Sequence, residues 1–311
     1  MYKKRDKFYM KRLFLIGNGF DIAHNLPTKF NPNFKMIAER NESINFFWDI
    51  YQSNKPNIWA DFENALGHPD FISLEEIFDG YAPDYTSDYE SDRDAIITQV
   101  DINGNLYKSL YEFAENAEKS IYQCSPNSKY ERMFNTKCYF INFNYTHTLE
   151  TLYGINDNKI IHIHGEVGKN NLIFGYPKGS FNPEKYRYDF RQKGRGPYVD
   201  YEIEKFIEMM HESERFDYYT YQAYKSLLDK TKSFCKIPQL DLLDRFLDNN
   251  EFDEIVVIGH SCKIDYSYFE FLNNKYKNLL WNFWAHTEKD KANILNLISK
   301  ISILNYKIEI R

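Results

Sequence analysis

Residues 13–21 read Leu13-Phe14-Leu15-Ile16-Gly17-Asn18-Gly19-Phe20-Asp21. Four apolar residues run directly into a glycine turn, which is the pattern of a strand that is buried on both faces and ends in a loop. The same change from an apolar run to small or polar residues recurs at 138–146, 160–165 and 255–261. Ligands bind outside the carboxyl ends of the strands in an open parallel sheet. The four strand ends therefore predict one crevice that all of them line.

The remaining segments favour one α/β domain over residues 1–311. Short apolar runs at 279–284 and 303–310 are two further strand candidates. Between the strands lie long stretches in which the strand signal is missing. We expect a Rossmann-like, mostly parallel sheet flanked by helices, with helical insertions at about 30–125 and 182–235.

Four features are expected within the insertions. Apolar residues at helical spacing predict helices over 33–59 and 103–122. The stretch 79–94 contains six Asp or Glu residues among Tyr, Ser and Pro, a composition that disfavours regular structure and predicts a surface loop. Residues 194–197 form a Gly-Arg-Gly-Pro turn, which is either an ordinary surface turn or part of a lid.

The composition indicates a folded protein of the cytoplasm. Hydrophobic residues make up 43% of the chain and aromatic residues 18%, which excludes general disorder although the mean hydropathy is -0.63. The net charge of -6 offers no overall field for duplex nucleic acid. The four cysteines form no Cys-x-x-Cys pair, and we find neither a secretory signal nor an apolar run long enough to span a membrane.

The turn Gly17-Asn18-Gly19-Phe20-Asp21 follows a strand and is expected to open a helix, the context of a nucleotide-binding loop. Glycines allow the backbone to approach a pyrophosphate, and a helix N-terminus attracts its charge. Ile22 stands where the full dinucleotide fingerprint has its third glycine. A purely structural tight turn is the alternative. If the turn binds nucleotide, Gly19→Val should weaken binding and leave the fold largely intact.

Asn142, Asn144 and Thr146 share parity along the chain and would project to one side of an extended strand end. Asparagine is poor in a buried strand, so its presence here favours hydrogen bonding to a ligand. Local hydrogen bonds to a turn at the strand end are the structural alternative.

Two chemical interpretations fit the motif His162-Ile163-His164-Gly165-Glu166. His162, His164 and Glu166 would share a face of an unbroken strand, and two histidines with a carboxylate can hold a metal. Gly165 makes that continuation doubtful, so we favour His164 as a general base presented at the strand end and expect no metal. A histidine that only makes hydrogen bonds in the core is the third alternative.

The fourth strand end, Gly259-His260-Ser261-Cys262-Lys263, is similar to the Gly-x-Ser-x-Gly elbow of serine hydrolases. Lys263 replaces the final glycine that the strained elbow needs, so Ser261 is better explained as a ligand-binding hydroxyl than as a nucleophile. Asp265 lies just beyond. It either caps the following helix or binds a ribose.

In this order, the motifs of the chain resemble the AbiH family of bacterial phage-defence (abortive infection) proteins. The resemblance spans nearly the whole chain and is carried by Leu15-Ile16-Gly17-Asn18-Gly19-Phe20-Asp21, Trp59-Ala60-Asp61-Phe62-Glu63, Asn142-Phe143-Asn144-Tyr145-Thr146 with Leu149-Glu150, His162-Ile163-His164-Gly165, and Gly259-His260-Ser261 with Asp265. AbiH-like proteins in turn resemble sirtuin-like defence domains, which bind and hydrolyse NAD on a Rossmann-like sheet.

The resemblance implies an abortive-infection effector that hydrolyses NAD to nicotinamide and ADP-ribose. It implies Asn144 and His164 as catalytic residues. It implies a binding set that holds NAD as the substrate, made of Gly17, Asn18, Gly19, Asp21, Thr146, Gly259, Ser261 and Asp265. Deacylation is not implied, because Thr146 stands where sirtuins usually have Asp and the zinc-binding cysteine pairs have no counterpart. A phage or cellular trigger and a homo-oligomer are left open as partners.

Three other functional classes remain open. A non-catalytic sensor would bind NAD or a related nucleotide and leave it intact. A metal-dependent phosphoesterase or nuclease would use His162, His164 and Glu166, with Asp21 as an optional further ligand, and would lose its activity to a chelator. A serine hydrolase would use Ser261 and His286.

Overall fold

The computed structural model describes residues 10–40, 58–69, 103–180 and 228–311. The chain divides into two compact units, each assembled from segments that are distant in sequence. The first comprises Met1–Phe34, Leu110–Phe174 and Ile237–Arg311, and the second comprises Lys35–Ser109 and Gly175–Lys236. The acidic stretch 79–94 and the turn 194–197 lie outside the described residues, as does most of the predicted insertion 182–235.

The first unit contains a six-stranded sheet in which every neighbouring pair of strands is parallel. Its strands are β1 (Arg12–Ile16), β2 (Tyr139–Asn142), β3 (Ile160–His162), β6 (Glu254–Ile258), β7 (Leu280–Ala285) and β8 (Tyr306–Ile310). The order across the sheet is β3-β2-β1-β6-β7-β8. This is the Rossmann strand order, which reverses between β1 and β6. The predicted α/β sheet is confirmed, including the strands expected at 279–284 and 303–310.

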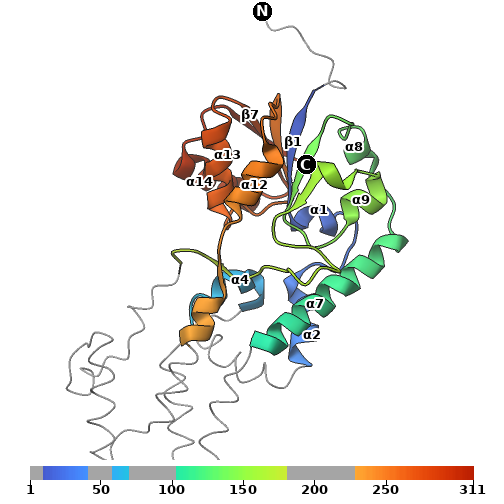
Figure 1. Cartoon of the computed structure of the whole chain (residues 1–311), viewed down its shortest axis with the longest axis vertical. Coiled ribbons are helices and arrows are strands. Elements are labelled where there is room, and N and C mark those ends of the chain that lie inside the picture. The colour runs from blue at the N-terminus through green and yellow to red at the C-terminus, as the bar shows by residue number, and fades with distance from the viewer. Residues whose placement is uncertain (1–9, 41–57, 70–102, 181–227) are drawn as a thin grey trace, which may run out of the picture. The chain divides into compact units, whose positions relative to one another are not determined.

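Helices cover both faces of this sheet (Figure 1). The helices on one face are α12 (Leu240–Leu247), α13 (Tyr266–Lys275) and α14 (Glu288–Ile301), and those on the other are α1 (Asn18–Ile22), α8 (Ser128–Glu131) and α9 (Thr148–Tyr153). A capping box defines the start of α14: the Thr287 hydroxyl accepts from the Asp290 backbone N–H, and the Asp290 carboxylate accepts from the Thr287 N–H.

The core follows the alternation of side chains along the strands. In β1, Leu13 and Leu15 pack with α12, α13 and α14, whereas Phe14 and Ile16 pack with α1, α8 and α9. All five residues of β1 and all five of β6 are buried. The first residues of the two strands, Arg12 and Glu254, are buried as an ion pair at 3.0 Å, and the remaining positions are apolar because the strands are covered on both faces. The continuous apolar runs in the sequence have this origin.

The second unit contains a short parallel pair of strands, β4 (Tyr176–Pro177) and β5 (Cys235–Lys236), with the helical turns η3 (Ile58–Asp61) and α4 (Phe62–Ala65) and the helix α2 (Lys35–Glu39). Within it, the buried Lys236 ammonium lies 2.7 Å from the Glu63 carboxylate. The motif Trp59-Ala60-Asp61-Phe62-Glu63 lies on η3 and the start of α4. The helix expected over 33–59 is described only at its two ends.

The helix α7 (Asn103–Ser120), followed by the turn η4 (Ile121–Gln123), confirms the helix expected over 103–122. Its residues alternate between buried and exposed with the helical period. No helix within the described part of the chain is long and apolar enough to cross a membrane.

Candidate functional site

The loops after β1 and β6 meet where the strand order reverses. The Gly17 N–H donates to the Ile258 carbonyl at 2.9 Å, and the Gly19 N–H donates to the Gly259 carbonyl at 2.8 Å. The loop after β2 joins them, because the Asn144 side-chain amide donates to the Gly17 carbonyl at 3.3 Å. Three of the four predicted strand ends therefore lie in direct contact at the position where Rossmann-like sheets bind ligands.

The three glycines permit these loops to touch each other. A Cβ on Gly17 would lie 2.6 Å from the Cα of His260, and one on Gly19 would lie 2.7 Å from the Cα of Gly259. Gly259 has a φ of +67°, and a Cβ there would lie 2.3 Å from the Phe20 nitrogen. Because these neighbours are backbone atoms, a side chain at Gly19 must displace the opposite loop. The expectation that Gly19→Val leaves the fold largely intact is therefore wrong.

Asp21 is buried under this junction. Its carboxylate accepts hydrogen bonds from the Thr146 hydroxyl at 2.5 Å and from the Thr148 hydroxyl at 2.9 Å, and it is 1% exposed. Burial raises the pKa of Asp21 to about 6, although the hydrogen bonds from Thr146, Thr148 and Asn144 lower it. Asp21 and Thr146 thus connect α1 to the loop after β2. Asn18 also points into the protein, since its amide donates to the Thr28 carbonyl at 2.6 Å.

The loop after β2 carries its own hydrogen bonds. The strand ends at Asn142, whose side chain accepts from the Asn144 N–H at 3.0 Å and donates to the Thr146 carbonyl at 3.3 Å. The extended chain assumed for Asn142, Asn144 and Thr146 is therefore wrong beyond Asn142. The turn directs Asn144 toward Gly17 and Thr146 toward Asp21.

His164 lies beyond the end of β3 and faces Asp265. Its Nε2 is 3.2 Å from Asp265 Oδ1 but is not aligned for a hydrogen bond, and it has no other hydrogen-bond partner among the described residues. The other carboxylate oxygen of Asp265 is 3.4 Å from Nε2 of His260. The Cys262 N–H donates to Nδ1 of His260, so the proton of a neutral His260 ring is on Nε2 and faces Asp265. One buried carboxylate thus lies between two imidazoles.

Asp265 holds this position with an unusual backbone. It precedes α13 with a φ of 66°, and its side chain makes no capping hydrogen bond. Cys262, in the same loop, also has a positive φ of 56°. Aspartate tolerates this region better than most residues, and such outliers concentrate at functional sites. The capping role considered for Asp265 is therefore not observed.

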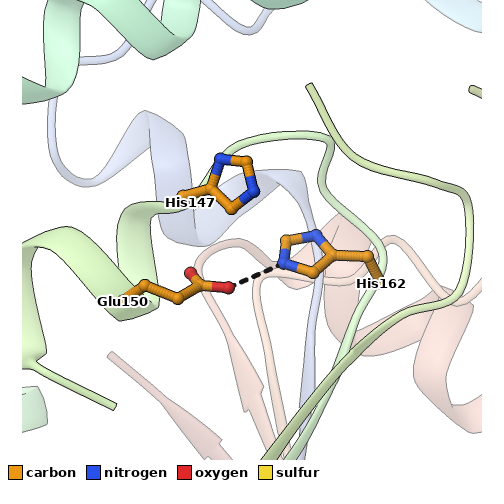
Figure 2. A group of neighbouring side chains, drawn as sticks. All are labelled: His147, Glu150 and His162. Carbon is orange, nitrogen blue, oxygen red and sulfur yellow. Dashed lines mark hydrogen bonds and ion pairs between the residues drawn. The ribbon is translucent and has the colours of Figure 1, made fainter. Parts of the chain in front are cut away.

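A second cluster consists of His147, Glu150 and His162 (Figure 2). The Nε2 of His162 lies 2.8 Å from Glu150 Oε1, and candidate ligand atoms of His147, Glu150 and His162 all lie within 4.8 Å of one another. No other three His, Cys, Asp or Glu residues meet this criterion in the part of the chain that the structure describes. The metal-binding set considered from sequence, His162 with His164 and Glu166, is therefore not brought together.

His147 is held between two carboxylates. Its Nδ1 is 3.1 Å from Glu118 Oε1, and its Nε2 is 2.9 Å from Glu166 Oε2. The hydrogen bond to Glu118 raises the pKa of His147 to about 9, against the effect of burial. Burial raises the pKa of Glu118, but its hydrogen bonds with His147 leave that pKa below the ordinary value. The sequence analysis missed His147 as a site residue, and the available signal was its position three residues before Glu150.

Ser261 does not occupy a nucleophile elbow. It is exposed, its hydroxyl accepts from the Lys263 N–H at 3.5 Å, and α13 begins only at Tyr266. The Nδ1 of His286 lies 3.0 Å from the Arg311 carbonyl. The tight turn from strand to helix that presents a nucleophile is missing at this position.

A surface pocket of about 630 Å³ lies elsewhere in the first unit, between the end of α1 and residues 120–127. Its lining includes His24, Asn25 and Cys124. None of the predicted site residues lines it. This pocket is therefore separate from the junction of the strand ends.

The comparison with known proteins identifies one family. A model described as bacteriophage abortive infection AbiH matches residues 13–284, which include every strand end discussed above. No curated protein and no solved structure matches the chain. The match covers far more than half of the sequence. The chain therefore belongs to the AbiH family of bacteriophage abortive-infection proteins.

Proposed function

We propose that this member of the AbiH family acts in phage defence by binding NAD at the junction of β1 and β6 and hydrolysing it to nicotinamide and ADP-ribose. One observation carries the proposal. The Nε2 of His164 is buried beside Asp265 at the strand ends, and it lacks a hydrogen-bond partner within the described residues. An unpartnered buried polar atom is costly, and such atoms concentrate where a ligand or a reacting group binds.

The reaction needs a positioned water and a base. The bond between the ribose C1′ and the nicotinamide nitrogen breaks, and its electron pair moves to that nitrogen, which loses its positive charge. The water oxygen bonds to C1′, and His164 accepts the proton that the water releases. The carboxylate of Asp265, 3.2 Å from Nε2, would stabilise the positive charge of the imidazolium that forms. The Asn144 side chain, which also contacts the loop of Gly17, would hold the water or a ribose hydroxyl.

The loops of Gly17, Gly19 and Gly259 would bind NAD through the shape of their backbone, because these residues carry no charged side chain. Gly17, Gly19 and Gly259 pack against each other, so the pyrophosphate would meet the outer surface of this junction near the start of α1. Ser261 is exposed next to the junction and is the hydroxyl best placed to contact a ribose. Asn18, Asp21 and Thr146 would support the loops from behind.

The experiment is a measurement of cellular NAD during phage infection or overproduction of the chain. NAD should fall with the natural sequence. His164→Ala and Asn144→Ala should each prevent the fall, because a general base and a positioning group commonly contribute about 10²-fold or more. Asn158→Ala is the matched control, since this residue is exposed on a short helical turn and should leave the fall unchanged.

The nucleotide sensor is the second candidate for the same crevice, and the same unpartnered Nε2 of His164 supports it. It would bind NAD or a related nucleotide without producing nicotinamide. Calorimetry on the purified chain with NAD, combined with chromatography of the products, separates the two. The sensor would replace the hydrolase if three results hold together. The chain binds NAD more tightly than His164→Ala does, NAD is recovered intact, and cellular NAD stays stable. We also propose a trigger from the phage or the host, which is tested by adding lysate of infected cells to the purified chain. A homo-oligomer is a further proposal, which is tested by measuring the mass of the protein in solution.

A further inference from the structure

The cluster of His147, Glu150 and His162 lies outside the chemistry just proposed. His147 immediately precedes α9, Glu150 lies in its first turn, and His162 is the last residue of β3. The three side chains converge from these two elements (Figure 2). Each of the three residues has a nitrogen or oxygen within 4.8 Å of the ligand atoms of the other two. Two imidazoles and a carboxylate form a common ligand set for a divalent metal ion.

Both imidazoles are oriented by contacts on their Nδ1 atoms. Nδ1 of His147 is 3.1 Å from the Glu118 carboxylate, and Nδ1 of His162 is 3.1 Å from the Asn144 carbonyl. A histidine that binds a metal almost always donates its other ring N–H to a carboxylate or a carbonyl, which fixes the ring. The cluster thus has supporting contacts on Nδ1 of both rings. The Nε2 atoms face carboxylates, at 2.9 Å from Glu166 for His147 and at 2.8 Å from Glu150 for His162, so a metal bound there would replace the two Nε2–H contacts.

One carboxylate oxygen of Glu150 in the cluster lacks a hydrogen-bond partner within the described residues. Glu150 Oε1 takes up the contact with His162, while the buried Oε2 of Glu150 has no hydrogen-bond partner among the residues that the structure describes. A buried carboxylate oxygen without a partner is costly, and a cation would remove that cost. A network of ion pairs alone explains His147, which contacts Glu118 and Glu166, but it does not explain this oxygen.

The charges also favour a cation. Glu118, Glu150 and Glu166 supply three carboxylates around the two imidazoles, and the ammonium of Lys169 lies at the edge, 2.6 Å from Glu166. Imidazole nitrogen selects first-row transition metals over Mg²⁺ and Ca²⁺, which prefer oxygen ligands. Three protein ligands leave room for a water or a further carboxylate, and Glu166 is the nearest candidate.

We propose that His147, Glu150 and His162 bind one divalent transition-metal ion of the Zn²⁺ class. The ion would tie the start of α9 to the end of β3. Since Nδ1 of His162 contacts the Asn144 carbonyl, it would also help to fix the loop after β2. This site differs from the predicted set of His162, His164 and Glu166, and it goes beyond the expectation that no metal is needed. It is independent of NAD cleavage.

Metal binding by the purified chain tests the proposal without any assay of activity. The full chain is stripped with a chelator, dialysed, and titrated with Zn²⁺ by calorimetry and with Co²⁺ by visible absorption. We expect about one ion per chain and a Co²⁺ spectrum that differs from that of the hydrated ion. His162→Ala, His147→Ala and Glu150→Gln should each weaken binding at least about tenfold, a loss that even supporting residues of metal sites produce.

Two controls make the result decisive. His286→Ala removes an exposed imidazole outside the cluster and should bind Zn²⁺ like the natural chain. Circular dichroism of the metal-free variants shows whether they fold, and Glu150→Gln keeps the shape of the side chain. If the natural chain binds neither Zn²⁺ nor Co²⁺, or if the three ligand variants bind as tightly as His286→Ala, the metal site does not exist. Because NAD is not added, this outcome is separate from any failure of the proposed hydrolase.

Discussion

Because Asp21 is buried, the free energy of unfolding of this protein should depend on pH. Its carboxyl is 1% exposed, and burial raises its pKa to about 6 from the ordinary value of 3.8. In the folded protein Asp21 therefore binds its proton more tightly than in the unfolded chain. Ionising it costs stability. That cost is absent below about pH 4, grows as the pH rises, and is complete above about pH 6.

The magnitude follows from the size of the shift. A pKa raised by roughly two units corresponds to about 3 kcal/mol of stability at neutral pH, counted as an upper bound. The linkage relation places about 2 kcal/mol of this between pH 4.5 and 7. The threonine hydroxyls that bond Asp21 can also bond an amide, so Asp21→Asn keeps much of the packing and removes the titration.

The assay is urea unfolding of the natural chain and of Asp21→Asn at several pH values between 4.5 and 7. The stability of the natural chain relative to the variant should fall by about 2 kcal/mol over this range. Asn158→Ala is the control, because Asn158 is exposed and does not ionise, so this substitution should give a difference that hardly changes with pH. A difference between the natural chain and Asp21→Asn that stays constant, or that grows with pH, would refute the argument that burial dominates at Asp21.

Three shorter predictions concern single substitutions. Gly19→Ala should cost about 1–3 kcal/mol in urea unfolding, because its Cβ meets the backbone of Gly259, and a variant as stable as the natural chain would contradict this packing. On the proposed function, Asp265→Asn should slow the cleavage of NAD about 10²-fold or more without changing nucleotide affinity, because its amide N–H would face His164; unchanged cleavage would remove Asp265 from the proposed mechanism. Thr287→Ala should cost about 1 kcal/mol by removing the cap of α14, which thermal melting measures and which an unchanged midpoint would contradict.

The sheet of this protein could be predicted from local sequence. A strand covered on both faces requires an unbroken apolar run, and a run that ends in glycine or asparagine marks a strand end, so residues such as Leu13 and Val256 identify their strands without knowledge of any neighbour. Four of the six parallel strands, β1, β2, β3 and β6, were found in this way. The segments of β7 and β8 were strand candidates without such an ending, and β8 is largely exposed. The Rossmann-like class followed because parallel strands require helical crossovers.

The roles of single residues depended on partners that are distant in sequence. Gly19 looked like a phosphate-binding glycine, but Gly259, which faces it, comes 240 positions later in the chain. Asp21 looked like a ligand-binding carboxylate, but Thr146 and Thr148 bury it. Spacing along the chain cannot reveal such contacts, since parallel strands that are adjacent in space are far apart in sequence.

The sequence by itself therefore determined the strands, the edge of the sheet at which the polar residues gather, and the family. Only the tertiary structure decided which polar residues meet. It separated His162 from His164 although a single residue lies between them, because β3 ends at His162 and the turn at Gly165 sends the next histidine toward Asp265. A strand places alternate residues on one face only while it continues, so the two histidines take different partners where it stops.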